Sequence, residues 1–256
     1  MRVSPAASWT LERNDRRLRF AAGESVAVLH ESGPFRVTPH RQPAWKIVLP
    51  LGGTVAIRFG DGRGLESDGG VIVPPQVSHT CEVSSEYVAL TVDSWALAAG
   101  STPSRIEADA ARRMRSAALP RSDDEVDVEA VRAELYRVAP RSTVKDERVV
   151  RALRAIAADH DASIASIAQD LTLSAPRLRA LVRGQVPVPL ARLRLWARLN
   201  AAVAGLPASS VAAVAAATGF ADQAHLTRTA RGLIGRTFSE FGPPSAPPRP
   251  ARRRAS

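Results

Sequence analysis

The sequence predicts an α+β protein, in which an N-terminal β-barrel is followed by an all-α domain with two helix-turn-helix motifs. Three observations predict this fold. Short apolar stretches separated by Gly, Pro and Asp continue to about residue 92, a pattern typical of strands and turns. From residue 102 the apolar residues recur at helical spacing. Between residues 163 and 241 one helical pattern occurs twice.

Length and charge indicate how the chain is divided. A chain of 256 residues has room for two domains that each bury a core. Residues 1–145 carry a net charge of +1 and residues 146–256 carry +9, which together give +10. We expect a β domain at 1–100, a helical connector at 101–143, an all-α domain at 144–242, and a basic, Pro-rich tail without a core at 243–256.

Short apolar runs in the N-terminal region predict strands. They occupy residues 25–29, 35–37, 45–51, 54–59, 71–73 and 87–92. A spacing of about ten residues suggests a sandwich or a barrel closed on itself. Residues 45–59 resemble a hairpin, with Gly52 and Gly53 able to adopt positive φ at its turn. Residues 1–16 show no clear period and are expected to form a loose arm.

The helical period begins in the connector. Ile106, Ala110 and Met114 form one apolar stripe, and a second stripe follows the break at Pro120. Acidic residues at 123–129 favour a helix start, where they complement the helix dipole. Residues 144–158 then predict the first helix of the all-α domain.

The repeated pattern fills the rest of the all-α domain. Each copy, at 163–184 and 209–232, has a short Ala-rich helix, a tight turn and a second helix that carries arginines. Residues before the turn correspond at a shift of 47: Ile164, Ile167 and Ala168 match Val211, Val214 and Ala215. Residues after it correspond at a shift of 48: Leu178, Arg183 and Gly184 match Leu226, Arg231 and Gly232. This is the pattern of a helix-turn-helix, whose second helix lies in the major groove of DNA.

A helix is predicted between the two copies, at residues 187–207. About 17 helical residues at roughly 1.5 Å each give a strut of about 25 Å. With the widths of the helices at its ends, the strut approaches the roughly 34 Å between successive major-groove faces of B-DNA. One chain could therefore place two reading helices in adjacent grooves.

Residues 219–241 resemble the C-terminal signature of the AraC/XylS family of bacterial transcription regulators. The matching positions are Gly219, Phe220, Asp222, Gln223, Arg228, Gly235, Thr237 and Phe241. The resemblance covers about 100 residues, and residues 163–199 are similar to the first helix-turn-helix of that family. The sequence departs from the pattern at some core positions: Leu226 and Ala230 stand in place of aromatics, Phe238 in place of proline, and Val182 and Pro187 in place of Phe and Gly.

The chemistry of the second helices suggests how DNA would be read. Arg177, Arg179 and Arg183 of the first copy could bond guanine or phosphate, and each could also be a solvated arginine. In the second copy the candidates are Gln223 for adenine, Ala224 and Thr227 for a thymine methyl group, and Arg228 and Arg231 for bases or phosphates. The family resemblance places Pro176, Arg179, Ala180, Ala224, Thr227 and Arg228 at base-facing positions.

Residues 69–83 resemble a strand and Pro-rich turn of cupin-like sensing domains, which implies that residues 1–100 sense an effector. His40, Trp45 and His79 could line an apolar pocket for this effector, whereas Trp45 could equally be a core residue. No His-X-His pair follows the first strands, so we expect no metal site and no cofactor. The implied partners are double-stranded DNA and a small molecule, with RNA polymerase and a second copy of the chain as further candidates. Helices at 102–139 would form a dimer interface or pack on their own barrel.

Several classes of protein are disfavoured. Cys81 is the only cysteine, which excludes an internal disulfide and a four-cysteine zinc site. No apolar run reaches the roughly 18 residues that span a membrane, and no signal-peptide core is found, so a soluble cytoplasmic protein is expected. We predict a regulator and no enzyme. The alternatives are a metal-dependent cupin enzyme fused to a DNA-binding module and a DNA repair protein that accepts alkyl groups on cysteine.

Overall fold

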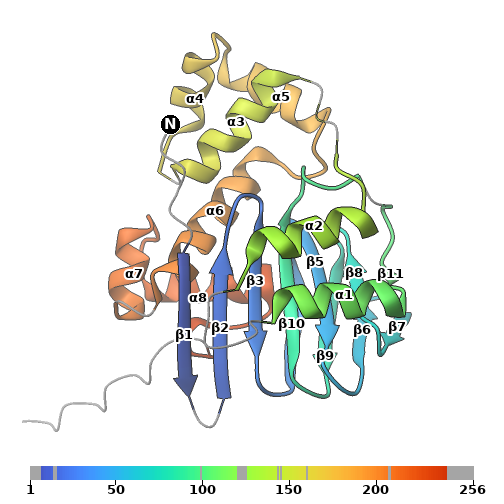
Figure 1. The fold of residues 1–256 in the computed structure, drawn as a ribbon. Helices are drawn as coiled ribbons and strands as arrows, with labels where there is room; N and C mark the ends of the chain where they lie inside the picture. Colours follow the sequence, from blue (N-terminus) through green and yellow to red (C-terminus); the bar gives the residue numbers. More distant parts are fainter. Residues whose placement is uncertain are drawn as a thin grey trace, which may run out of the picture.

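The computed structural model describes residues 7–13, 16–98, 100–119, 126–142, 144, 146–159, 161–206 and 209–240. It contains a β-sheet domain followed by a helical domain (Figure 1). This arrangement confirms the predicted α+β class. The expected tail at 243–256 and residues 1–6 of the expected arm lie outside the described residues.

The N-terminal domain is built from two antiparallel sheets. The larger contains, in spatial order, β1 (Ala7–Arg13), β2 (Arg16–Ala22), β3 (Val26–Glu31), β10 (Tyr87–Asp93), β5 (Ala44–Pro50), β8 (Val71–Val73) and β11 (Ser104–Arg105). The smaller contains β4 (Phe35–Arg41), β9 (Ser78–Val83), β6 (Val55–Phe59) and β7 (Gly64–Ser67). The two sheets enclose an apolar core that includes Val48, Val55, Ile57 and Val83.

Two expectations about the strands are wrong. The predicted hairpin at 45–59 does not form, because β5 pairs with β10 and β8 while β6 pairs with β7 and β9. The turn between them crosses from one sheet to the other, and Gly53 adopts φ +64° there. The expected loose arm is partly ordered, because β1 pairs with β2 along residues 7–13.

Helices α1 (Ala108–Ala118) and α2 (Val128–Val138) cover the outer face of the larger sheet (Figure 1). Met114 of α1 and Leu135 of α2 are fully buried in a core with Ile47 and Leu90 of the sheet. The two helices therefore pack on the chain's own sheet, which is one of the two placements that the sequence left open. Asp127 caps α2 by accepting a hydrogen bond from Ala130 N at 2.9 Å.

The helical domain contains α3 (Glu147–Ala158), α4 (Ile164–Asp170), α5 (Ala175–Arg183), α6 (Leu190–Ala204), α7 (Val211–Ala217), α8 (Gln223–Ile234) and the short 3-10 helix η2 (Phe238–Glu240). Helices α4 and α5 form the first helix-turn-helix, and α7 and α8 form the second. Their cores are separate. The first joins α3, α4, α5 and the start of α6, whereas the second joins the end of α6, α7, α8 and η2 to strands β1–β3.

Candidate functional site

The second helix of each motif, α5 or α8, begins with a side-chain cap. Ser174 Oγ accepts a hydrogen bond from Arg177 N at 3.3 Å at the start of α5. Asp222 Oδ1 accepts one from His225 N at 2.6 Å at the start of α8. These bonds satisfy backbone N–H groups that have no partner within the helix. Both helices therefore have defined first turns, the part of a recognition helix that contacts base edges.

The predicted DNA-binding residues lie on the outer faces of these two helices. Arg177, Arg179 and Arg183 of α5 are exposed. On α8, Gln223, Ala224, Arg228 and Arg231 are exposed, and Thr227 is half-buried. The opposite faces are anchored by Leu178 and Leu226, both fully buried. Each copy therefore presents its polar residues outward from a fixed apolar base.

The turns inside the two motifs share one backbone feature. Thr172 has φ +55° in the first turn and Gly219 has φ +72° in the second. A β-carbon on Gly219 would lie 2.8 Å from Asp161 Oδ1 and 3.1 Å from Arg198 Cζ. Arg198 of α6 donates to Gly219 O at 3.1 Å, so the connecting helix supports the second turn directly. The 15 residues of α6 give a strut of about 22 Å, slightly shorter than expected.

A buried charge cluster lies where the helical domain meets the sheets. Arg236, which follows α8, donates from Nη1 to Glu31 Oε2 at 2.6 Å and from Nη2 to Glu31 Oε1 at 3.2 Å. The Tyr87 hydroxyl also donates to Glu31. The exposed fractions of the two charged side chains are 8 % for Arg236 and 1 % for Glu31. Burial favours the neutral acid, but bonds and charge from Arg236 outweigh it and hold the pKa of Glu31 below its usual value.

Beside this cluster, the interior contains His40, His79 and a lysine. The two histidine rings lie with their centroids 4.3 Å apart and their planes tilted by 55°. His40 Nδ1 lies 2.9 Å from Thr38 O and therefore carries the proton, so Nε2 accepts from Lys46 Nζ at 3.4 Å. Burial and the charge of Lys46 lower the pKa of His40 to about 2 and that of His79 to about 3. Both histidines are therefore neutral at physiological pH.

Trp45 does not join these histidines, so the predicted grouping of the three is wrong. Successive residues of β5 point to opposite faces of the sheet. Trp45 therefore packs beneath α1 and α2, which agrees with the alternative that it is a core residue. Lys46 points to the opposite face, toward His40. Within the described residues no carboxylate pairs with Lys46, and burial lowers the pKa of its amine, with the charge of Arg236 adding to this effect. A lysine inside an otherwise apolar strand was the signal that sequence reasoning missed.

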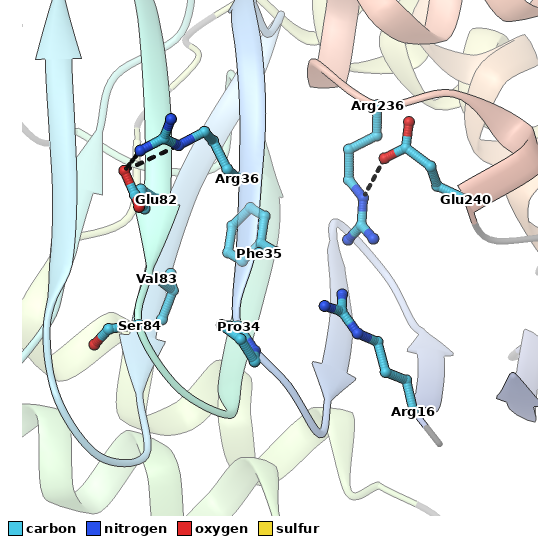
Figure 2. Close-up of a pocket in the computed structure, with 9 residues that line it drawn as sticks. All are labelled: Arg16, Pro34, Phe35, Arg36, Glu82, Val83, Ser84, Arg236 and Glu240. Carbon is cyan, nitrogen blue, oxygen red and sulfur yellow. Dashed lines mark hydrogen bonds and ion pairs between the residues drawn. The ribbon is translucent and has the colours of Figure 1, made fainter. Parts of the chain in front are cut away.

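A cavity of about 310 Å³ opens beside the charge cluster. Figure 2 shows Phe35 near its centre, with Arg36 and Glu82 on one side and Arg16 and Arg236 on the other. The lining is completed by Pro34, Val83, Ser84 and Glu240. Arg16 Nη1 lies 3.2 Å from Glu31 Oε1 and its side chain is 42 % exposed. The cavity is therefore rimmed by guanidinium groups around one aromatic ring.

The described residues contain no group of three or more His, Cys, Asp or Glu side chains placed to hold a metal ion. Likewise, no helix within them is both long and apolar enough to cross a membrane.

Comparisons with known proteins point to one architecture. A family model described as a helix-turn-helix domain matches residues 167–242. An apo variant of ToxT from Vibrio cholerae strain SCE256 is 11% identical, with a TM-score of 0.56 over 86% of this chain and 97% of that one. ToxT from Vibrio cholerae O395 bound to (E)-4-(8-methylnaphthalen-1-yl)but-3-enoic acid is 10% identical, with a TM-score of 0.54 over 85% and 96%.

A further structure, wild-type ToxT from strain SCE256 with a bound unsaturated fatty acid, is 11% identical and gives a TM-score of 0.52 over 85% of this chain and 93% of that one. Comparison with curated proteins finds no match. The matches to ToxT extend over both halves of the chain, so the β-sheet domain and the helical domain together share its fold.

Proposed function

We propose that this chain is a DNA-binding transcription regulator with an AraC-type helix-turn-helix domain, and that it reads one operator with two helices in adjacent major grooves. Its family and fold point to a regulator rather than to an enzyme. The observation that carries the proposal is the pair of capped helices, α5 and α8, whose polar residues are exposed above buried apolar faces. The strut α6 joins them at a length suited to one turn of B-DNA.

We expect selection of bound DNA from a random pool to return a site with two sequence blocks about one helical turn apart. The salt concentration must be fixed, because phosphate contacts make affinity strongly salt-dependent. The Arg179→Ala substitution should cost about 1–3 kcal/mol at one position of the block read by α5, and Gln223→Ala a similar amount at one position of the block read by α8.

The control is Arg151→Ala, which removes an exposed arginine from α3, outside both reading helices. This variant should leave the base preference at every position of the DNA site unchanged. A loss for Arg179→Ala that is equal on all DNA sequences would instead assign Arg179 to phosphate. Recovery of a single block would contradict the two-groove arrangement.

The β-sheet domain would then sense a small acid. ToxT has been solved with a fatty acid and with a butenoic acid derivative, both carboxylic acids. In this chain a carboxylate would suit Lys46, which lacks a carboxylate partner among the described residues and whose Nζ lies 5.8 Å from the ring centroid of Phe35, a residue that lines the guanidinium-rimmed cavity. His40 and His79 flank the lysine, so they are the candidate effector contacts that the structure supports.

We expect some members of a panel of unsaturated fatty acids to raise the midpoint of thermal unfolding, and their primary amides to have no effect. A ligand that binds the folded state alone raises the free energy of unfolding by about 2.7 kcal/mol at a hundred times its Kd. Lys46→Met keeps the shape of the buried side chain and should abolish the shift. Equal effects of acid and amide, or an unchanged shift in the variant, would rule out a carboxylate site at Lys46.

A further inference from the structure

The inner face of the larger sheet is wider than the smaller sheet that faces it. Strands β10, β5 and β8 are covered by the smaller sheet, through the core that contains Val48, Val71 and Tyr87. Strands β1–β3 are covered by the second helix-turn-helix, which lies against them in Figure 1. The helical domain thus supplies part of the wall that closes the β-sheet domain.

This second contact is a shared core. Leu18 of β2 and Ala44 of β5 are buried with Trp196 of α6, Leu226 of α8 and Phe238 of η2. Trp9 of β1 adds a hydrogen bond from its indole Nε1 to Val203 O at 3.2 Å. Burial of this kind contributes about 25 cal/mol per Å² of apolar surface, so separating the two parts would expose a substantial hydrophobic area.

Backbone contacts fix the end of α8 on the sheet. Strand β4 has a register shift between Val37 and His40, which leaves Thr38 free of its neighbour β9. Thr38 N and its hydroxyl both donate to Gly235 O, each at 3.1 Å. Arg236 follows this glycine directly. Its ion pair with Glu31 joins two residues that are 205 positions apart in the sequence.

The first helix-turn-helix meets the β-sheet domain differently. Its core has its own buried residues, among them Leu153, Ile167 and Leu178, and the half-buried Trp95, which follows β10, packs against them from the β-sheet domain. The ion pair that joins α3 to the β2–β3 turn is Arg154 with Glu24, at 4.0 Å and with both side chains more than 60 % exposed, at 71 % and 65 %. Exposed pairs of this kind contribute little to stability.

We propose that the second helix-turn-helix is a fixed part of the β-sheet domain, clamped by Glu31, Arg236 and Gly235, and that regulation moves the first helix-turn-helix relative to it. This inference rests on the proposed function and divides the chain at α6, whereas the sequence favoured a boundary near residue 144. The residues of α8 proposed to read DNA stay exposed while α8 is clamped. The clamp therefore positions α8 without covering its reading face, and a sensed signal acts on the distance and angle between α5 and α8.

Native-state hydrogen exchange of the full-length protein tests this inference without DNA. Amides of α7 and α8 should open together with those of β2 and β3, in one cooperative unit. Amides of α4 and α5 should open more readily, in a separate unit. If α7 and α8 instead exchange together with α4 and α5, as one helical body distinct from the sheets, the proposal is overturned.

Glu31→Gln tests the clamp itself, because it removes the buried counter-charge of Arg236 and leaves it paired with the more exposed Glu240, at 3.4 Å. Loss of one partner of a buried pair should speed exchange in α7 and α8 by about a hundredfold to a thousandfold, while α4 and α5 keep their rates. Glu82→Gln is the matched control, since it breaks the exposed pair with Arg36 on the other side of the same cavity. Equal acceleration in both motifs would contradict the proposal.

Should Glu31→Gln fail to fold, the exchange pattern of the parent protein still tests whether α7 and α8 open with the sheet. Failure to bind DNA, by contrast, would reject the proposed function and leave the exchange pattern as it is.

Discussion

Gly235→Ala is expected to lower the free energy of unfolding by about 2–5 kcal/mol. Gly235 ends α8 in the left-handed conformation, with φ +73°, which an alanine adopts only with strain. A β-carbon there would lie 2.6 Å from Thr38 O and 2.7 Å from His40 Nδ1, which belong to strand β4. Since one contact is backbone and the other a buried ring, neither can move cheaply. Urea unfolding followed by circular dichroism measures the loss.

Gly232→Ala provides the matched control in the same helix. Gly232 is helical and exposed, and a β-carbon there would meet no atom within 4 Å. Alanine is a better helix former than glycine, so this variant should be more stable than the parent by about 0.5–1 kcal/mol. If Gly235→Ala cost only the roughly 1–2 kcal/mol of the left-handed conformation itself, Gly235 would have no role beyond ending its helix, and the close packing of α8 on β4 would lose its support.

The helical domain could be predicted from the sequence because its signals are local. Ser163, Ser174, Ser210 and Asp222 precede four of its helices, and each side chain accepts a hydrogen bond from a nearby backbone N–H. Apolar residues at helical spacing then give the buried face of each helix. These patterns extend over only a few residues, so the two helix-turn-helix motifs and their exposed arginines could be placed without knowing the rest of the fold.

The sheets were harder to predict because strand pairing is not local. Residues 45–59 have the composition of a hairpin, yet β5 and β6 pair with other strands and lie in different sheets. Strand β1 was missed because only its contact with β2 and α6 orders it. The same limitation applies to Trp45. The alternation of side chains along a strand predicts that Trp45 and Lys46 point to opposite faces of the sheet. It does not predict which of the two faces is covered by helices.

The charge cluster had no signal in the sequence at all. Glu31 and Arg236 lie at opposite ends of the chain and meet only because the second helix-turn-helix packs on strands β1–β3. Their pairing also explains why the two domains are less separate than the composition suggests. A helical domain with a strong positive charge would be expected to stand apart, whereas one of its arginines is buried in the wall of the β-sheet domain.

The departures from the AraC/XylS pattern gain a physical reason in this core. Leu226 and Ala230, where aromatic residues are usual, are fully buried beside Phe238, which stands where proline is usual. All three side chains belong to one apolar cluster. A larger side chain at 238 therefore partly offsets the smaller ones on α8, as close packing of a protein interior requires.

For this reason we expect Phe238→Ala to cost about 3–5 kcal/mol of folding free energy. The phenyl ring is fully buried and packs in the core shared by α6, α8 and the larger sheet, so its removal leaves a cavity that no neighbouring backbone can close easily. Urea unfolding gives the loss directly. Hydrogen exchange should show it in α7 and α8 together with β2 and β3, because the same ring supports both.

Phe59→Ala is the control, since Phe59 is also aromatic but only partly buried, at the edge of the core between the two sheets. Its loss should be clearly smaller and should leave exchange in α7 and α8 unchanged. Equal losses would mean that Phe238 acts as an ordinary core aromatic. A loss confined to α7 and α8, with β2 and β3 unaffected, would mean that the ring stabilises the helical domain alone. Only a loss shared across the contact fits a second helix-turn-helix that is built into the β-sheet domain.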